Sequence, residues 1–314
     1  MKKFIKKLLI FSIFPILFIL GIVAYNYSVD PYGVFRGNIS KQANEPNQHY
    51  LKVNYILNNP EKYNAFLFGN SRVGKIDVGK IKDNNTWYNM TYSEGLPGEH
   101  LDNLKLFIKK GVTINKIFLG VDEISCFTRR EGHDSESIRK PYKNKFDPYV
   151  SYFFLKPSYS LAEAIVNVKQ QKFYEEGMYA TIYKTGSFPP NKKDIYIDEN
   201  KETHKNDKIF TEPYWPSVRT NNIKQCLEDI KEFKKLCDAN NIELEIFINP
   251  IFIETYKRAL DKGFLGFVEQ LKTIDTVYDF NQFTEITTNS LNYYENSHYR
   301  PKVGDIMVEK FFNK

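Results

Sequence analysis

An uninterrupted apolar run near the N-terminus constrains this chain more than any other feature. The run from Leu8 to Tyr25 holds no charged residue, and four lysines precede it: Lys2, Lys3, Lys6 and Lys7. At ~1.5 Å per residue it covers ~27 Å, and with Phe4 and Ile5 it is long enough for a hydrocarbon core of roughly 30 Å. The sequence therefore predicts one membrane-spanning helix.

The lysines lie on one side of the run only, which places the N-terminus in the cytoplasm and the rest of the chain outside it. The alternative is a cleaved signal peptide. The run is longer than the 7–15 apolar residues typical of such a peptide, and no small-residue cleavage site follows it. We therefore expect a single-pass anchor.

The same lysines account for most of the chain's charge. The sequence holds 44 basic and 38 acidic residues, a net charge of +6, which falls to +2 without those four lysines. A nearly neutral exterior domain has no basic surface for nucleic acid, so the sequence argues against a nucleic-acid partner.

Beyond the anchor, short apolar strands alternate with helical patterns. Strands are expected at 65–69, 86–92, 116–122, 242–250 and 276–281, and helices at 97–111, within 220–241, at 252–274 and at 303–312. Such alternation predicts an α/β domain with a parallel, flavodoxin-like sheet covered on both faces, which makes three α/β/α layers.

Composition divides the chain into a basic tip and anchor (1–26), a juxtamembrane linker (27–60) and an extracytoplasmic domain (61–314). Helical and strand periodicity weakens over 127–219, where aromatic residues are dense. We interpret this stretch as an insertion near the carboxyl edge of the sheet, whose aromatics either pack a core or form a surface on which sugars stack.

Cysteine and histidine usage indicates neither a disulfide framework nor a metal site. Cys226 and Cys237 share the apolar face of one expected helix, so buried thiols are expected for these two and for Cys126. No cysteine–histidine spacing is typical of zinc, and no cofactor is expected. Three histidines, His100, His133 and His204, are expected on the surface or on helices and receive no role.

Ser71 follows the first strand by two residues, at the edge of a parallel sheet where ligands bind. A serine there either caps a turn or, with a base, acts as a nucleophile. The strongest candidate base is His298, and Glu295, three residues earlier, can orient its imidazole. Asp279 is a reserve acid, and a purely structural His298 is the alternative.

Two motifs together resemble the SGNH (GDSL-like) hydrolase superfamily: Gly69-Asn70-Ser71 after the first strand, and Glu295-x-x-His298 before the last helix. With the anchor, they look closest to membrane-anchored bacterial members, the DltD-type proteins of teichoic-acid D-alanylation and the proteins that O-acetylate exopolysaccharides. The resemblance covers roughly residues 60–126 and 220–314.

The resemblance implies a catalytic triad of Ser71, His298 and Glu295, with glutamate where the family has aspartate. It also implies an oxyanion hole formed by the Ser71 N–H and Gly95. The family's third oxyanion donor is an asparagine, whereas this chain has Asp122, whose ionised carboxylate accepts hydrogen bonds and repels an oxyanion.

Asn70 and Arg72 flank the serine and are predicted to bind substrate. Arg72 would form an electropositive rim for an anionic acceptor or for the incoming carbonyl oxygen. A surface ion pair is the alternative.

Three functions stay open at this point. The first is a bacterial membrane-anchored acyltransferase that moves an acetyl or D-alanyl group to or from a cell-surface polysaccharide or teichoic acid; in this superfamily such members often work with a multi-pass membrane O-acyltransferase. The second is an esterase with the same triad. The third is a non-catalytic, polymer-binding assembly subunit on the same scaffold.

Overall fold

The computed structural model describes residues 1–35, 44–155, 162, 165–166, 181–188, 190–216 and 219–313. The chain divides into two compact units. The first, here called the anchor unit, comprises Met1–Asn47 and Tyr142–Tyr179, and the second, the sheet unit, comprises Gln48–Pro141 and Ala180–Lys314.

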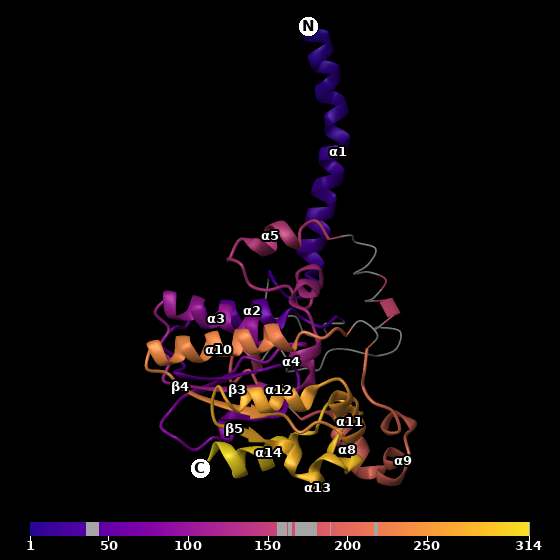
Figure 1. Ribbon diagram of the computed structural model, residues 1–314. Coiled ribbons are helices and arrows are strands. Elements are labelled where there is room, and N and C mark those ends of the chain that lie inside the picture. Colours follow the sequence, from indigo (N-terminus) through magenta and orange to yellow (C-terminus); the bar gives the residue numbers. More distant parts are fainter. Residues whose placement is uncertain are drawn as a thin grey trace. The chain divides into compact units, whose positions relative to one another are not determined.

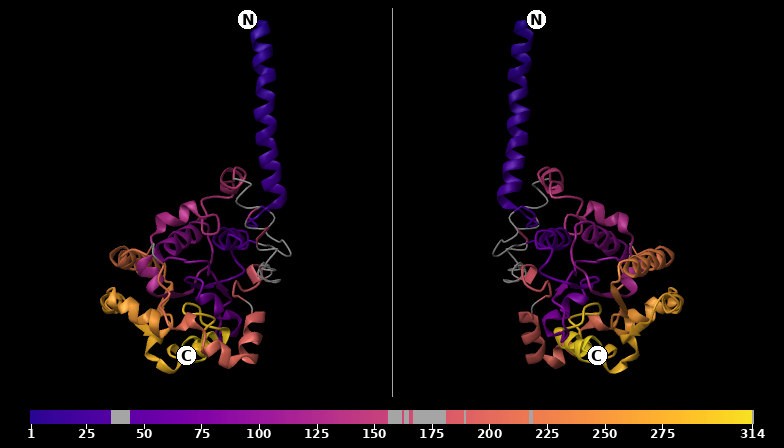
Figure 2. Two further views of the ribbon diagram at one scale, coloured as in Figure 1. Left: turned by 90° about the vertical axis from the view of Figure 1, so that its right-hand side faces the viewer. Right: turned by 90° about the vertical axis from the view of Figure 1, so that its left-hand side faces the viewer.

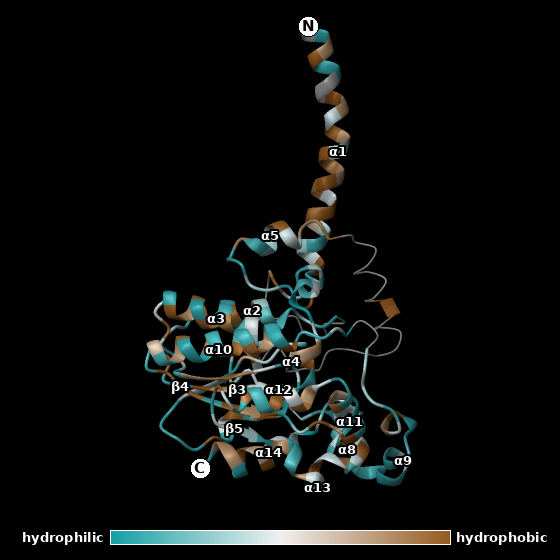
Figure 3. Ribbon diagram, in the orientation of Figure 1, coloured by the Kyte–Doolittle hydropathy of each residue, from teal (hydrophilic) through white to brown (hydrophobic). Residues whose placement is uncertain are grey.

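The anchor unit contains helix α1 (Lys2–Val29), which ends where Asp30 adopts a left-handed conformation with φ of 44°. Among the described residues, one helix, Lys3–Val29, is long and apolar enough to cross a membrane, and brown, apolar residues predominate in its middle part in Figure 3. The short helix α5 (Asp147–Ser151) belongs to the same unit (Figure 1).

The sheet unit is built on five parallel strands in the order β2-β1-β3-β4-β5. The strands are β1 (Ala65–Phe68), β2 (Trp87–Asn89), β3 (Lys116–Val121), β4 (Glu243–Ile248) and β5 (Val277–Asp279). The predicted α/β class and parallel sheet are therefore confirmed. The strand order reverses between β1 and β3, and ligands of parallel sheets bind outside the carboxyl ends at such a reversal.

Helices precede, connect and follow these strands along the chain (Figure 1). The α-helices are α2 (Gln48–Leu57), α3 (Pro97–Lys109), α4 (Glu123–Phe127), α8 (Lys192–Glu199), α9 (Lys201–Lys205), α10 (Ile223–Ala239), α11 (Ile253–Asp261), α12 (Phe264–Leu271), α13 (Thr284–Thr287) and α14 (Pro301–Met307). A π-helical turn, Val308–Phe312, continues α14, and short 3-10 turns occur at Val73–Lys75, Val78–Lys80, Arg130–Ser135, Lys208–Phe210, Phe280–Gln282 and Ser290–Asn292. The prediction of a single helix over 252–274 is wrong. Two helices, α11 and α12, are separated at Gly263, whose φ of +97° lies in the left-handed region and interrupts the helix.

Successive residues of β1 contact different parts of the core. The Phe66 ring packs on Phe107 of α3 and the Phe68 ring on Phe233 of α10, with centroids 5.6 and 5.8 Å apart. Ala65 and Leu67 belong instead to the cluster that contains Phe118 and the C-terminal Phe312. β1 is therefore buried throughout, and the turn that follows it rests on a rigid base.

The structure divides the sequence differently from the expected linker and insertion. Residues 48–57, placed in the linker by composition, form α2, and Lys52 of this helix is fully buried in the sheet unit. The expected insertion separates, with 142–179 in the anchor unit and its flanks in the sheet unit. Cys126, Cys226 and Cys237 are buried free thiols, as predicted.

Candidate active site

The turn after β1 presents Ser71 at the carboxyl edge of the sheet. Gly69 approaches its neighbours so closely that a Cβ atom there would lie 2.7 Å from Cγ1 of Val73 and 3.0 Å from the carbonyl oxygen of Gly120. The Asn70 side chain accepts from the backbone N–H of Arg72 at 3.0 Å, and the Asn70 carbonyl accepts from the Thr91 hydroxyl at 2.6 Å. These hydrogen bonds hold the backbone of Asn70 and Arg72, the two neighbours of Ser71 in the chain.

Three predicted residues from the two ends of the sequence meet at this turn. Ser71 Oγ lies 2.8 Å from Nε2 of His298, and Nδ1 of His298 lies 2.5 Å from Oε1 of Glu295. An ionised carboxylate only accepts hydrogen bonds, so the Nδ1 proton points to Glu295 and the Nε2 lone pair is left for the Ser71 hydroxyl. The Ser71 hydroxyl is thus hydrogen-bonded to the His298 imidazole, which Glu295 orients.

Glu295 is held in its ionised form. Burial alone would raise the pKa of this carboxyl, but hydrogen bonds from the ring and backbone of His298 and the charge of Lys193 together lower its pKa below the usual range. Lys193 Nζ lies 3.8 Å from the second carboxylate oxygen. Asp279, the reserve acid, instead accepts from the backbone N–H of Asn281 at 2.9 Å and caps a turn.

The loop that carries His298 is fixed by contacts that composition does not reveal. Tyr293 and Tyr299 form an antiparallel bridge across it. Arg300, next along the chain, donates from Nε to Asp194 Oδ1 at 2.9 Å and from Nη2 to Asp198 Oδ2 at 3.0 Å. Both aspartates lie on α8, so a helix from the expected insertion supports the loop that carries His298.

The prediction that Arg72 forms an exposed electropositive rim is wrong. Its side chain is fully buried and donates to both oxygens of Glu123, at 2.6 and 2.7 Å. Its Nε also donates to the carbonyl oxygen of Ser297 at 2.7 Å. The guanidinium is committed to intramolecular partners, because a buried charge needs them.

The prediction that Asn70 binds substrate is also wrong. Its Nδ2 donates to both oxygens of Asp122, at 2.8 and 2.9 Å, and its Oδ1 faces the turn. Asp122 itself is fully buried, accepts from Asn249 Nδ2 at 3.1 Å and pairs with Arg72 Nη1 at 2.9 Å. Asp122 therefore holds Asn70 and Arg72 of the turn that carries Ser71, and its carboxylate contributes no oxyanion donor.

Of the predicted oxyanion donors, the Ser71 N–H has no hydrogen-bond acceptor among the described residues. The Gly95 N–H is engaged, since it donates to the Tyr92 carbonyl at 3.2 Å. Gly95 has a different function: a Cβ there would lie 2.7 Å from the Gly69 carbonyl oxygen, so only glycine lets the loop after β2 reach the nucleophile turn. The role predicted for the Gly95 N–H is corrected accordingly.

Several residues of the site were missed from sequence. Glu123, Asn249 and Ser297 complete a buried hydrogen-bond network around Arg72 and Asp122. Separately, Lys52 Nζ donates to the carbonyl oxygens of Asn89 and Thr91 at 3.1 and 2.7 Å. Asn249 and Thr91 follow strands β4 and β2, so the rule that located Ser71 could have located them. Lys52 has no such signal.

Of the surface or helix positions expected for three histidines, the helix position holds for His100 on α3 and His204 on α9, and His133 lies on the 3-10 turn Arg130–Ser135. A surface position is wrong for all three. All three are buried, and His100 Nε2 lies 3.1 Å from both N and O of Gly69. Burial lowers the pKa of His100 to about 3, so its ring is neutral. An uncharged His100 thus contacts Gly69, at the start of the turn that carries Ser71.

Within the described residues, no group of three or more His, Cys, Asp or Glu side chains is arranged to hold a metal ion. In comparisons with known proteins, no family model matches the chain. No curated protein matches it either.

Proposed function

We propose that this chain is a serine acyltransferase, in which Ser71 carries the acyl group and His298 and Glu295 activate it. The observation that supports the proposal is the pair of hydrogen bonds, 2.8 and 2.5 Å, that joins the three side chains. A serine hydroxyl is a weak nucleophile until a base takes its proton and a third group orients that base.

We further propose that the sheet unit is a three-layer SGNH-like domain held outside the bacterial cell membrane by α1, with the N-terminus in the cytoplasm. The strand order supports the fold proposal, and so do the positions of Ser71, three residues after the end of β1, and His298, three residues before the start of α14. The length and apolarity of α1, with lysines before the apolar run, support the topology.

In the first half-reaction, Ser71 Oγ attacks the carbonyl carbon of an acyl ester while Nε2 of His298 takes the hydroxyl proton. The carbonyl oxygen gains negative charge and accepts from the Ser71 backbone N–H. Glu295 stabilises the imidazolium that forms. When the carbon–oxygen bond of the ester breaks, His298 returns the proton to the departing alcohol, and the acyl group stays on Ser71.

In the second half-reaction, an acceptor hydroxyl gives its proton to His298 and attacks the acyl carbon. The Ser71 ester bond breaks, and the proton returns to Ser71 Oγ. We propose that the acceptor is a cell-surface polysaccharide or teichoic acid and that a multi-pass membrane O-acyltransferase supplies the acyl group. The motif resemblance and the anchor support this choice over water, which as acceptor would make the protein an esterase.

The proposal is tested on the full-length chain in detergent with an aryl acetate and an excess of a soluble glycan. We expect aryl alcohol release and transfer of acetyl to the glycan, both lost in Ser71→Ala and both kept in Ser135→Ala, a matched change at an exposed serine. Release without transfer would support the esterase. Equal release by Ser71→Ala would contradict the proposal.

A further inference from the structure

A short segment of the anchor unit exposes large apolar side chains. Phe146, Val150 and Phe154, in and beside α5, are 63, 70 and 60% exposed. Single exposed apolar residues are ordinary, but three within nine residues of one segment form a patch that water solvates poorly. Here residues 146–154 are called the interfacial segment.

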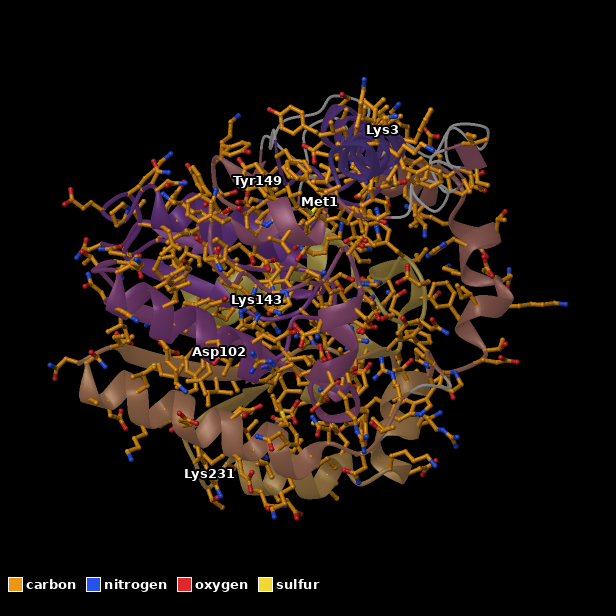
Figure 4. The ribbon with its side chains drawn as sticks, turned by 90° about the horizontal axis from the view of Figure 1, so that it is seen from above. Met1, Lys3, Asp102, Lys143, Tyr149 and Lys231 are labelled. Carbon is orange, nitrogen blue, oxygen red and sulfur yellow. The ribbon has the colours of Figure 1, made fainter. Side chains whose placement is uncertain are left out.

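The interfacial segment is attached to the C-terminal end of α1. Asn26 of α1 is fully buried, and its Nδ2 donates to the carbonyl oxygens of Phe153 and Leu155, both at 2.9 Å. The Tyr27 ring lies 6.2 Å from the Phe153 ring. Figure 2 shows α5 beside this end of α1. The ring centroid of Tyr149 in α5, labelled in Figure 4, lies 5.6 Å from that of Phe35, which lies 5.5 Å from that of Tyr27 in α1.

This attachment fixes the segment relative to the apolar run. From Phe4 to Tyr25 the helix rises ~33 Å, slightly more than a hydrocarbon core of roughly 30 Å. If α1 spans the bilayer, Asn26 emerges where acyl chains meet headgroups. Residues hydrogen-bonded to Asn26 then lie at the same depth.

The composition of the segment suits that depth. Aromatic residues are enriched at the membrane–water interface, where their rings lie among the headgroups. Lys143 and Lys145 are exposed beside the segment, and Nζ of Lys145 lies 5.0 Å from the Phe146 ring centroid. Lysines there can approach lipid phosphates while the rings enter the acyl boundary.

We propose that the interfacial segment is a second membrane contact, which inserts Phe146, Val150 and Phe154 into the headgroup–acyl boundary of the bilayer that α1 crosses. Two contacts, one spanning and one lying in the interface, restrict rotation of the anchor unit about α1. The proposal does not depend on the chemistry at Ser71.

The proposal is tested by fluorescence quenching. Lipids that carry bromine in the upper part of their acyl chains quench the fluorescence of a tryptophan inserted to that depth. The full-length chain is reconstituted in phosphatidylcholine–phosphatidylglycerol vesicles as Phe154→Trp, with Phe18→Trp in α1 and Leu265→Trp in α12 as controls. Phe18 is 70% and Leu265 55% exposed. The signal of the native Trp87 and Trp215 is measured on the unsubstituted chain and subtracted.

We expect bromolipid to quench Phe18→Trp and Phe154→Trp by at least half and Leu265→Trp hardly at all. Quenching of Phe18→Trp together with an unquenched Phe154→Trp would overturn the proposal and indicate that a protein surface covers the patch. An unquenched Phe18→Trp would overturn it as well, because α1 would then not lie in the bilayer.

Discussion

Arg72 and Ser297 are joined by two hydrogen bonds, from Nε to the Ser297 carbonyl oxygen at 2.7 Å and from Nη2 to its hydroxyl at 3.1 Å. Arg72 directly follows the candidate nucleophile, and Ser297 directly precedes the candidate base. The buried guanidinium therefore connects the two loops that form the site, although 225 residues separate them in sequence. Arg72 is a positioning residue rather than a ligand for substrate.

Substituting Arg72 should damage stability and activity separately. Arg72→Met leaves Asp122 buried without its cation and Glu123 with only a 3.8 Å contact to Arg219, which should lower the free energy of unfolding by roughly 3–5 kcal/mol. Arg72→Lys keeps the charge but cannot make the forked contact with Glu123, so we expect a folded protein with kcat/KM reduced about 10²-fold by misplacement of His298. Urea unfolding and aryl-ester kinetics measure the two effects.

Lys80→Met is the matched control, because Lys80 pairs with Asp305 at 2.7 Å on the surface, with both side chains about half exposed. Its unfolding free energy should change by less than about 1 kcal/mol. If Arg72→Lys keeps the wild-type kcat/KM and pH–rate profile, Arg72 does not position the base.

Changes at Glu295 test the orienting acid. Glu295→Gln removes the charge that stabilises the imidazolium and favours the wrong tautomer, so kcat should fall by roughly 10²–10⁴-fold. Glu295→Asp restores the carboxylate with one methylene fewer and should lose less. Steady-state kinetics of both variants decide the matter, and equal activity of Glu295→Gln and wild type would exclude Glu295 from the mechanism.

Asp122→Asn should destabilise the protein without speeding the reaction. Its carboxylate accepts from two asparagine side chains and pairs with Arg72, so a neutral amide breaks a buried network at a cost of about 3 kcal/mol. Chemical denaturation and rates per folded molecule are the measurements. A faster variant of unchanged stability would show that position 122 faces the oxyanion after all.

The contribution of His133 to stability should fall as the pH rises from 6 to 8. Burial on its own lowers the pKa of this imidazole, but contacts with Glu94 and Glu99 outweigh it and raise the pKa to about 9. A folded pKa above the unfolded value of ~6.5 gives stability that is complete below pH 6.5 and is lost as pH rises toward 9. His133 alone should lose about 2 kcal/mol between pH 6 and 8. His49 and His100, whose pKa values burial lowers, act in the opposite direction, because their unfolded forms lose protons over this range.

Denaturation curves of wild type and His133→Gln at the two pH values test this prediction. His133→Gln should be less stable than wild type at pH 6, and the difference in unfolding free energy between the two proteins should shrink by about 2 kcal/mol from pH 6 to 8. The range stops at pH 8, because burial raises the pKa values of the Cys126 and Cys237 thiols, and unfolded thiols ionise above ~8.5. Parallel pH dependence of the two proteins would assign the loss to other groups.

The sheet and the three central residues were accessible from sequence for clear physical reasons. The five strands, of three to six residues, lie within apolar runs of the sequence, and parallel strands bring their carboxyl ends to one edge. Ser71 follows the first of these ends. Glu295 and His298, three residues apart in one loop, needed only local geometry to meet.

The charged residues could not be placed in the same way, because burial of a charge depends on partners far away in sequence. Arg72 resembles a surface residue until Glu123 and Ser297 are seen beside it, and Lys52 until three backbone carbonyls surround its ammonium group. The break at Gly263 was missed because the apolar pattern continues across it.

The most direct test of the central claim, that Ser71 is an activated nucleophile, is covalent trapping. The full-length chain is treated with a fluorophosphonate and its peptides are analysed by mass spectrometry, alongside Ser71→Ala and His298→Gln. The account predicts one adduct on Ser71, no adduct in Ser71→Ala and labelling of His298→Gln slowed by roughly 10²-fold or more. Unlabelled Ser71 in folded protein, or labelling at equal rates with and without His298, would contradict it.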